Sequence, residues 1–198
     1  MTADSDESEL IEQAKTDKDA FGRLYERYVD RIYNYVYYRT GNAEDAEDLT
    51  ARIFFRAMQH IGNYHDRGLP FSAWLYRIAH NLVANWHRDR SRRKIISLDD
   101  ITQWQAPEKG PEFVTQLMED KDALLSAIRR LPAERQELLI LKFVEQLSNA
   151  EIGDIMGRSE GAIKSLYHRT LLALRDDLQR EHGLEPPKVR LSFLRRSK

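Results

Sequence analysis

The side chains in this chain with the clearest chemistry are suited to binding nucleic acid. A helix is expected over 71–93, and one arc beside its apolar stripe carries Trp74, Arg77, Asn81, Arg88 and Arg92. Asn85 lies between this arc and the stripe. Aromatic rings stack on bases, amides read base edges, and guanidinium groups hold phosphates. The arc therefore predicts a contact with single-stranded DNA. The alternative is that the tryptophans belong to the core, which we favour for Trp86.

A second candidate DNA-binding element has the pattern of a helix, a tight turn and another helix. Ser148 or Asn149 can cap the first helix, Gly157 can adopt a left-handed turn conformation, and Ser159 can cap the second helix. The outer face of the second helix is small at its start and then polar and basic, and its candidate DNA-binding residues are Ser159, Gly161, Lys164, Ser165, His168 and Arg169. Such a helix fits a major groove. The alternative is an ordinary helical hairpin with a solvated face.

Composition excludes several classes of protein. The 198 residues include no Cys, which rules out disulfide scaffolds, thiolate zinc sites and thiol nucleophiles. His80 and His87 are seven residues apart, which is not a convincing metal-binding pair, so we expect no metal and no cofactor. Because no nucleophile with a base, phosphate loop or metal cluster is evident, we expect a protein that is not an enzyme. No apolar run approaches a membrane span, which predicts a cytoplasmic protein without membrane insertion.

The net charge of −1 is an average over segregated segments. Residues 1–12 are acidic, and residues 43–48 read AEDAED, whereas basic residues cluster over 88–94 and 188–198. This segregation suits a polyanion partner on one side and a protein partner on the other. The alternative is that each charged run is a solvated face.

The elements that must position these residues are helices. Apolar residues recur with the helical period almost throughout, and no alternating run predicts a confident strand. We therefore expect an all-α fold of two small helical domains joined by a flexible linker. The expected boundaries are a first domain at 1–94, a linker at 95–115, a helix-turn-helix domain at 116–182 and a basic tail at 183–198.

Three separated segments carry a family resemblance. They are FGRLYERYVDRIYNYVYYRTGNAEDAEDLTARIFFRAM, FSAWLYRIAHNLVANWHRDRSRR and LPAERQELLILKFVEQLSNAEIGDIMGRSEGAIKSLYHRTLLAL. In this order and spacing the chain resembles an extracytoplasmic-function (ECF) sigma factor of the sigma-70 family. The resemblance implies a sigma region 2 domain, a linker and a sigma region 4 helix-turn-helix domain. It also implies a protein that directs promoter recognition, DNA melting and transcription initiation by RNA polymerase.

The resemblance implies partners as well. The largest-subunit clamp coiled coil of core RNA polymerase would bind Asp45, Asp48, Leu49, Ile53 and Phe54, and the polymerase flap would bind the second domain. The arc from Trp74 to Arg92 would hold the opened minus-ten element of promoter DNA, and the outer face from Ser159 to Arg169 would read the minus-35 element. An anti-sigma factor is a further implied partner. The chain departs from the family at Ala51 and Arg52, where Gln and Glu are usual, and at Leu166, where Arg is common.

Two other functions remain open at this point. One is a helix-turn-helix transcriptional regulator acting without polymerase, which would bind its operator tightly on its own. The other is an RNA-binding or antitermination protein that uses the Trp and Arg arc, which would bind single-stranded RNA without preferring promoter DNA. Neither alternative accounts for the AEDAEDLT segment together with the other two motifs.

Overall fold

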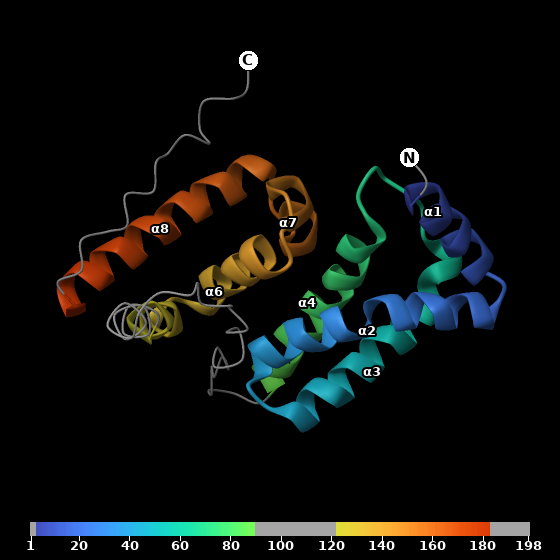
Figure 1. Cartoon of the computed structure of the whole chain (residues 1–198), viewed down its shortest axis with the longest axis horizontal. Helices are drawn as coiled ribbons and strands as arrows, with labels where there is room; N and C mark the ends of the chain where they lie inside the picture. Colours follow the sequence, from blue (N-terminus) through green and yellow to red (C-terminus); the bar gives the residue numbers. More distant parts are fainter. Residues whose placement is uncertain (1–2, 90–121, 183–198) are drawn as a thin grey trace, which may run out of the picture.

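The computed structural model describes residues 3–89 and 122–182, and every regular element within them is a helix (Figure 1). The predicted all-α fold is therefore confirmed. Residues 3–89, here called the N-terminal unit, form α1 (Ala3–Ala14), α2 (Lys18–Thr40), α3 (Ala43–His60), the 3₁₀ turn η1 (Ile61–Asn63) and α4 (Phe71–Asp89). Residues 122–182, here called the C-terminal unit, form a helix over 122–130 and then α6 (Ala133–Leu139), the π-helical turn η2 (Ile140–Val144), α7 (Asn149–Met156) and α8 (Glu160–His182).

Two expected segments fall largely outside this description. The predicted linker at 95–115 and the basic tail at 183–198 lie outside the described residues. Within the described ranges, no helix combines the length and apolarity that crossing a membrane requires.

Local capping signals set the ends of the N-terminal helices. Asp17 caps α2 by accepting a hydrogen bond from the backbone N–H of Asp19, at 2.9 Å. Gly41 ends the same helix with a φ of 66°, a left-handed conformation that glycine adopts without steric cost. Asn42 then caps α3 through the N–H of Asp45. Helices α2 and α3 therefore turn sharply against each other.

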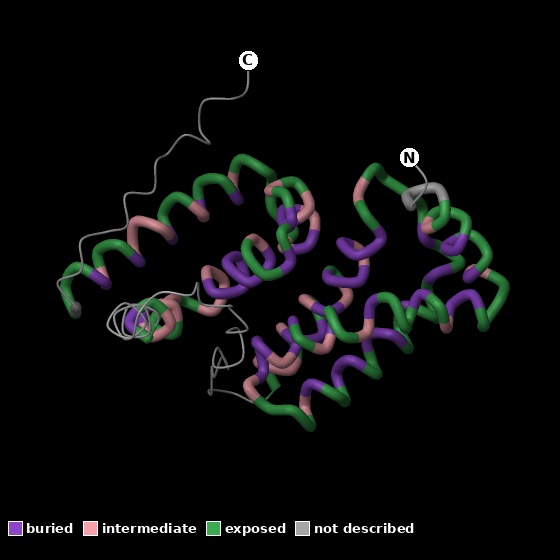
Figure 2. The backbone as a smooth tube through the Cα atoms, in the orientation of Figure 1, coloured by how far each residue is buried: buried purple, intermediate pink, exposed green. Residues whose placement is uncertain are grey.

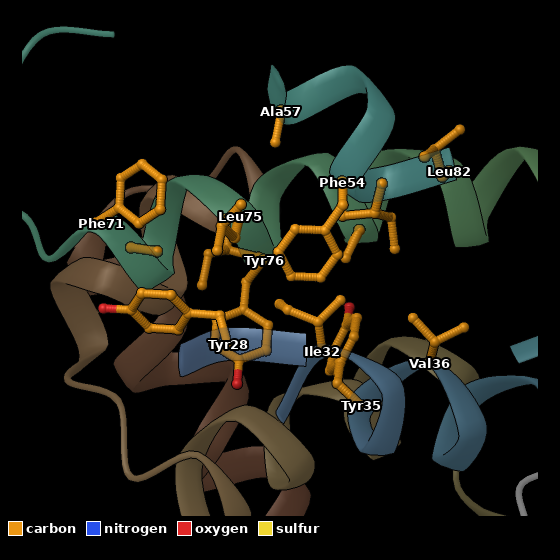
Figure 3. Close-up of a cluster of buried hydrophobic side chains, with 14 of the residues drawn as sticks. Tyr28, Ile32, Tyr35, Val36, Phe54, Ala57, Phe71, Leu75, Tyr76 and Leu82 are labelled. Carbon is orange, nitrogen blue, oxygen red and sulfur yellow. The ribbon is translucent and has the colours of Figure 1, made fainter. Parts of the chain in front are cut away.

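The core of the N-terminal unit lies between α2, α3 and α4 (Figure 3). Ile32 and Tyr35 of α2 meet Leu75 and Tyr76 of α4, and Ile53 of α3 closes the cluster; all five side chains are fully buried. Removing each such side chain from water stabilises the fold by about 1.5–3 kcal/mol. The face of α4 opposite this core is left to carry polar residues.

The helix-turn-helix forms through the predicted caps. Ser148 Oγ accepts a hydrogen bond from the N–H of Glu151, and the Glu151 carboxylate accepts one from the N–H of Ser148. Gly157 ends α7 with a φ of 65°. Ser159 Oγ then accepts a hydrogen bond from the N–H of Ala162 at the start of α8. The turn between α7 and α8 is thus specified by short-range contacts.

The two units share one apolar core. Buried side chains of the C-terminal unit belong to the same contiguous cluster as those of the N-terminal unit, including Leu138, Leu141, Ile152, Ile155 and Ile163. Helix α7 packs on α4. Figure 2 shows buried segments where α2, α3 and α4 face one another, and also along α6 and α7. The C-terminal unit therefore lies against the N-terminal unit and contributes to its core.

A polar cluster is buried where the units meet. Glu137 of α6 lies with Oε2 2.5 Å from Arg39 Nη1, accepts a hydrogen bond from the Tyr35 hydroxyl at 2.5 Å, and has Oε1 2.7 Å from His80 Nδ1. Burial alone would raise the pKa of Glu137, but the charge of Arg39, followed by contacts from His80 and Tyr35, lowers it to about 2. The carboxylate is therefore ionised in the folded protein.

This cluster predicts acid sensitivity. Because the folded-state pKa of Glu137 lies below the ordinary 4.5, its contribution is fully present above about pH 4.5 and is lost as the pH falls towards about 2. The contribution is on the order of 3 kcal/mol. We expect Glu137→Gln to flatten the fall in unfolding free energy over this window, measured by urea denaturation at several pH values. A Glu134→Gln variant should keep the full slope, and equal slopes in both variants would contradict the prediction.

Candidate nucleic-acid interface

A pocket of about 360 Å³ lies beside α4 and brings three predicted DNA-binding residues together. Trp74, Arg77 and Asn81 line it, as expected for side chains spaced along one face of a helix. Its opposite wall is the loop that joins η1 to α4, and Asp154 of α7 closes one end. The pocket therefore offers an aromatic ring, a guanidinium and an amide to one ligand.

Trp74 is held at the edge of the core by other aromatic rings. Its ring centroid lies 5.3 Å from those of Tyr64 and Phe71, with edge-to-face and tilted geometries. Such pairs contribute about 0.5–1.5 kcal/mol beyond the burial of apolar area. The indole is only partly buried, so it packs against the core and still lines the pocket.

The loop wall of the pocket was missed at the level of sequence, where residues 62–70 read only as a break between helices. Tyr64, His65 and Arg67 all line the pocket. Gly68 shapes this loop with a φ of 75°, and its N–H donates to the Asp66 carboxylate at 2.7 Å. The signal that could have found the loop is its mixture of aromatic and basic residues just before the Trp and Arg arc.

The later residues of the arc line a different pocket, of about 400 Å³, between α3 and α4. Asn85 and Arg88 contribute to it, with Arg88 Nη2 donating to Asn85 Oδ1 at 2.8 Å, and Arg52 and Arg56 of α3 face them. Trp86 packs against the core as predicted, and its Nε1 donates to Asp45 Oδ1 at 3.3 Å. The arc is therefore divided between two pockets. Arg92 lies outside the described residues.

The residues assigned to polymerase binding separate into two groups. Leu49, Ile53 and Phe54 lie in the core, with at most 5% of each exposed, so they position α3 and do not present a surface to a partner. Asp48 is exposed beside Arg52, at 3.6 Å. Asp45 is partly buried by its contact with Trp86.

Large apolar side chains on the outer surface were also missed. Phe55 is 57% exposed, and Met58 and Tyr25 are exposed to lesser extents, with Tyr25 edge-on to Phe54. Helical periodicity identified the stripe on α3, but it placed Met58 inward. Because α3 packs on α2 and α4 through Ile53 and Ala57, the neighbouring positions turn outward.

Helix α8 exposes the predicted polar face. Gly161, Lys164, Ser165, His168 and Arg169 are all exposed. Ser165 Oγ donates to the carbonyl of Gly161 at 3.0 Å and Arg169 Nε donates to the carbonyl of Ser165 at 3.3 Å, which orients both side chains along the helix. Lys164 pairs with Glu160 at 2.8 Å.

Two residues near the start of α8 have structural positions that the sequence did not reveal. Ser159 is exposed, and its hydroxyl already caps the helix. Leu166 is 5% exposed and belongs to the core cluster. Leu166 therefore packs inward and leaves the polar face to its neighbours.

Among the residues that the structure describes, no group of three or more His, Asp or Glu side chains is placed to hold a metal ion. The arrangement instead consists of two sets of DNA-compatible side chains, one on α4 and its loop and one on α8. This combination defines a helical protein with a strand-capturing unit and a helix-turn-helix unit.

Comparison with known proteins identifies this class. The model of sigma-70 region 2 matches residues 24–93, and the model of sigma-70 region 4 matches residues 121–174. ECF RNA polymerase sigma factor BldN of Streptomyces coelicolor is 42% identical over 176 residues, which cover 87% of this chain and 67% of that protein. ECF RNA polymerase sigma factor SigW of Bacillus subtilis is 33% identical over 83% of this chain and 92% of its own length. The chain belongs to the ECF RNA polymerase sigma factors.

Solved structures agree with the fold. CnrH, in complex with the cytosolic domain of CnrY, matches with a TM-score of 0.58 and 22% identity over 87% of this chain and 96% of its own. The sigma factor RpoE, in complex with the anti-sigma factor NepR from Bartonella quintana, matches with a TM-score of 0.62 and 19% identity over 83% of this chain and 99% of its own. The N-terminal unit is thus a region 2 domain and the C-terminal unit a region 4 domain.

Proposed function

We propose that this protein binds core RNA polymerase and directs promoter recognition, DNA melting and transcription initiation. The observation that carries the proposal is the convergence of Trp74, Arg77 and Asn81 on one pocket beside α4. An extracted base costs a few kcal/mol to unstack, and stacking on an indole with hydrogen bonds to an amide offsets that cost. The protein acts through binding in the cytoplasm, without bond chemistry of its own.

The two DNA-binding sites divide the promoter between them. The pocket beside α4 takes the melted minus-ten element, with Asn85 and Arg88 along the path of its backbone. The exposed face of α8 reads the minus-35 element in the major groove, with Lys164 on a phosphate and Ser165, His168 and Arg169 towards bases or phosphates.

Contacts with polymerase fall on other surfaces. Asp45 and Asp48 at the start of α3, with exposed Phe55 and Met58 on the same helix, suit the clamp coiled coil of the largest subunit. Exposed Phe143 offers an apolar contact for the flap. An anti-sigma factor controls the protein by covering such surfaces; the relatives CnrH and RpoE are known in complexes, the latter with an anti-sigma factor.

The direct test is a run-off assay with polymerase reconstituted from core enzyme and this protein. Sequencing the RNA ends and the bound DNA would give both promoter elements. Initiation at specific sites is expected. A protein that neither binds core polymerase nor starts any transcript would refute the proposal, and tight operator binding without polymerase would instead support an ordinary helix-turn-helix regulator.

Replacing Asn81 with Ala should separate melting from upstream recognition. Losing one base-reading amide is worth about 1–3 kcal/mol. We therefore expect fewer open complexes with Asn81→Ala, measured by permanganate reactivity of unpaired thymines, while binding to an upstream duplex stays nearly unchanged. Asn34→Ala, an exposed amide on α2, is the control. Equal loss of melting and upstream binding would contradict the division of labour.

A further inference from the structure

The region 4 domain lies on the face of region 2 that is proposed to take DNA. Asp154 of α7 lines the same pocket as Trp74, Arg77 and Asn81, with its Oδ1 3.5 Å from Arg77 Nη1. A guanidinium that would pair with a DNA phosphate is thus paired with a carboxylate of the same chain. In this arrangement the pocket is partly closed by the protein itself.

A second pair fixes the same interface further inside. Glu145, which follows η2, accepts hydrogen bonds from the Tyr76 hydroxyl and from Arg31 Nη2, the latter at 3.3 Å. The carboxylate is almost completely buried, and Tyr76 is fully buried. Because Glu145 comes from region 4 and both of its partners come from region 2, this contact exists only when the domains are together.

The three interdomain ion pairs all have the same polarity. Region 4 supplies the acids Glu137, Glu145 and Asp154, and region 2 supplies the corresponding cations, which are Arg39, Arg31 and Arg77, with His80 as a further partner of Glu137. Charge complementarity of this kind selects one docking geometry and steers association. DNA carries the same sign of charge as the three acids, so it competes for the basic side of the interface.

We propose that this interface is an autoinhibitory clasp: in the free protein, region 4 covers the minus-ten pocket of region 2, and the domains must separate before that pocket takes promoter DNA. The proposal rests on the proposed function of the α4 pocket. It follows that a protein closed most of the time binds single-stranded DNA more weakly than its open form, by the fraction that is open. Loosening the clasp therefore raises the apparent affinity for DNA.

The test measures domain separation and DNA binding in the full-length chain. Since the chain has no Cys, Gln59→Cys on α3 and Gln179→Cys on α8 provide unique exposed positions for a donor and an acceptor dye. The clasp variant combines Glu145→Gln with Asp154→Asn and leaves Glu137 in place to preserve the core. We expect lower energy transfer in the free clasp variant and at least threefold tighter binding of a single-stranded oligonucleotide with a minus-ten sequence.

Glu134→Gln is the matched control. Glu134 lies on the same face of the chemistry, an acid of α6 paired with Arg158, but this pair is internal to region 4. It should change neither readout. Asp154→Asn alone, at a half-exposed position, should give a smaller change in the same direction, which guards against misfolding of the double variant.

Three results would overturn the clasp. One is a wild-type protein whose low energy transfer shows the domains already apart. Another is unchanged transfer in variants that circular dichroism shows to be folded. The third is transfer that falls without any gain in DNA affinity, which would remove the inhibitory role. The run-off assay with wild-type protein reports on the proposed function separately in each case.

Discussion

Replacing Glu137 with Ala is expected to lower the free energy of unfolding by about 3–5 kcal/mol, because it leaves Arg39 as a buried charge without its carboxylate. Arg39 is only 4% exposed, and its Nε is already buried without a hydrogen-bond partner among the described residues. Water cannot reach the guanidinium to replace the lost partner. Urea denaturation of the full chain, followed by circular dichroism at neutral pH, measures the loss.

Two further variants separate the buried pair from a general effect of removing charge. Glu134→Ala breaks a pair whose side chains are both more than 40% exposed, and it should cost no more than about 1 kcal/mol. Replacing both partners, as Glu137→Leu with Arg39→Met, should recover most of the loss, since no unpaired charge then stays buried. A Glu137→Ala protein as stable as Glu134→Ala would contradict the assignment of Arg39 as a buried, dependent charge.

Gly153→Ala is the second large effect, and it acts on the helix-turn-helix. A Cβ at Gly153 would lie 2.6 Å from the backbone carbonyl oxygen of Arg158, closer than Cβ atoms approach in proteins. The turn between α7 and α8 must then move, and overpacking of this kind costs about 1–3 kcal/mol. We expect a lower melting temperature and weaker binding of the upstream duplex, measured by thermal denaturation and gel shift.

Gly22→Ala provides a control with the opposite expected sign. Gly22 lies inside α2, and a Cβ there would meet no atom within 4 Å. Replacing an unhindered helical Gly by Ala stabilises a helix by about 0.8–1 kcal/mol. If both glycine variants were stabilised, the close approach between Gly153 and Arg158 would not constrain the turn.

Elements specified by neighbours in the chain were predictable. The caps at Ser148 and Ser159, and the left-handed Gly157, were identified because each depends on atoms within a few residues. The convergence of Trp74, Arg77 and Asn81 was predictable for the same reason, since a helix alone brings these positions onto one face.

Burial decided by a distant partner was less predictable. Leu49, Ile53 and Phe54 were assigned a partner-binding role, but α2 and α4 cover them. Leu166 was compared with a DNA-facing position, yet it belongs to the core. Periodicity says that a helix has an apolar face, but not which neighbour covers it or where the cover ends.

The amino-acid sequence by itself determined the class of this protein. Helical period, local caps and three motifs in order are short-range properties, and they specified an all-α sigma factor with separate DNA-binding sites. Only the tertiary structure determined that Glu137, Glu145 and Asp154 of region 4 meet Arg39, Arg31 and Arg77 of region 2. Those pairs join residues 77 to 114 positions apart, or nearly so, in chain order, and no local rule relates them. Their attraction depends on the low-dielectric interface that forms when the two domains pack.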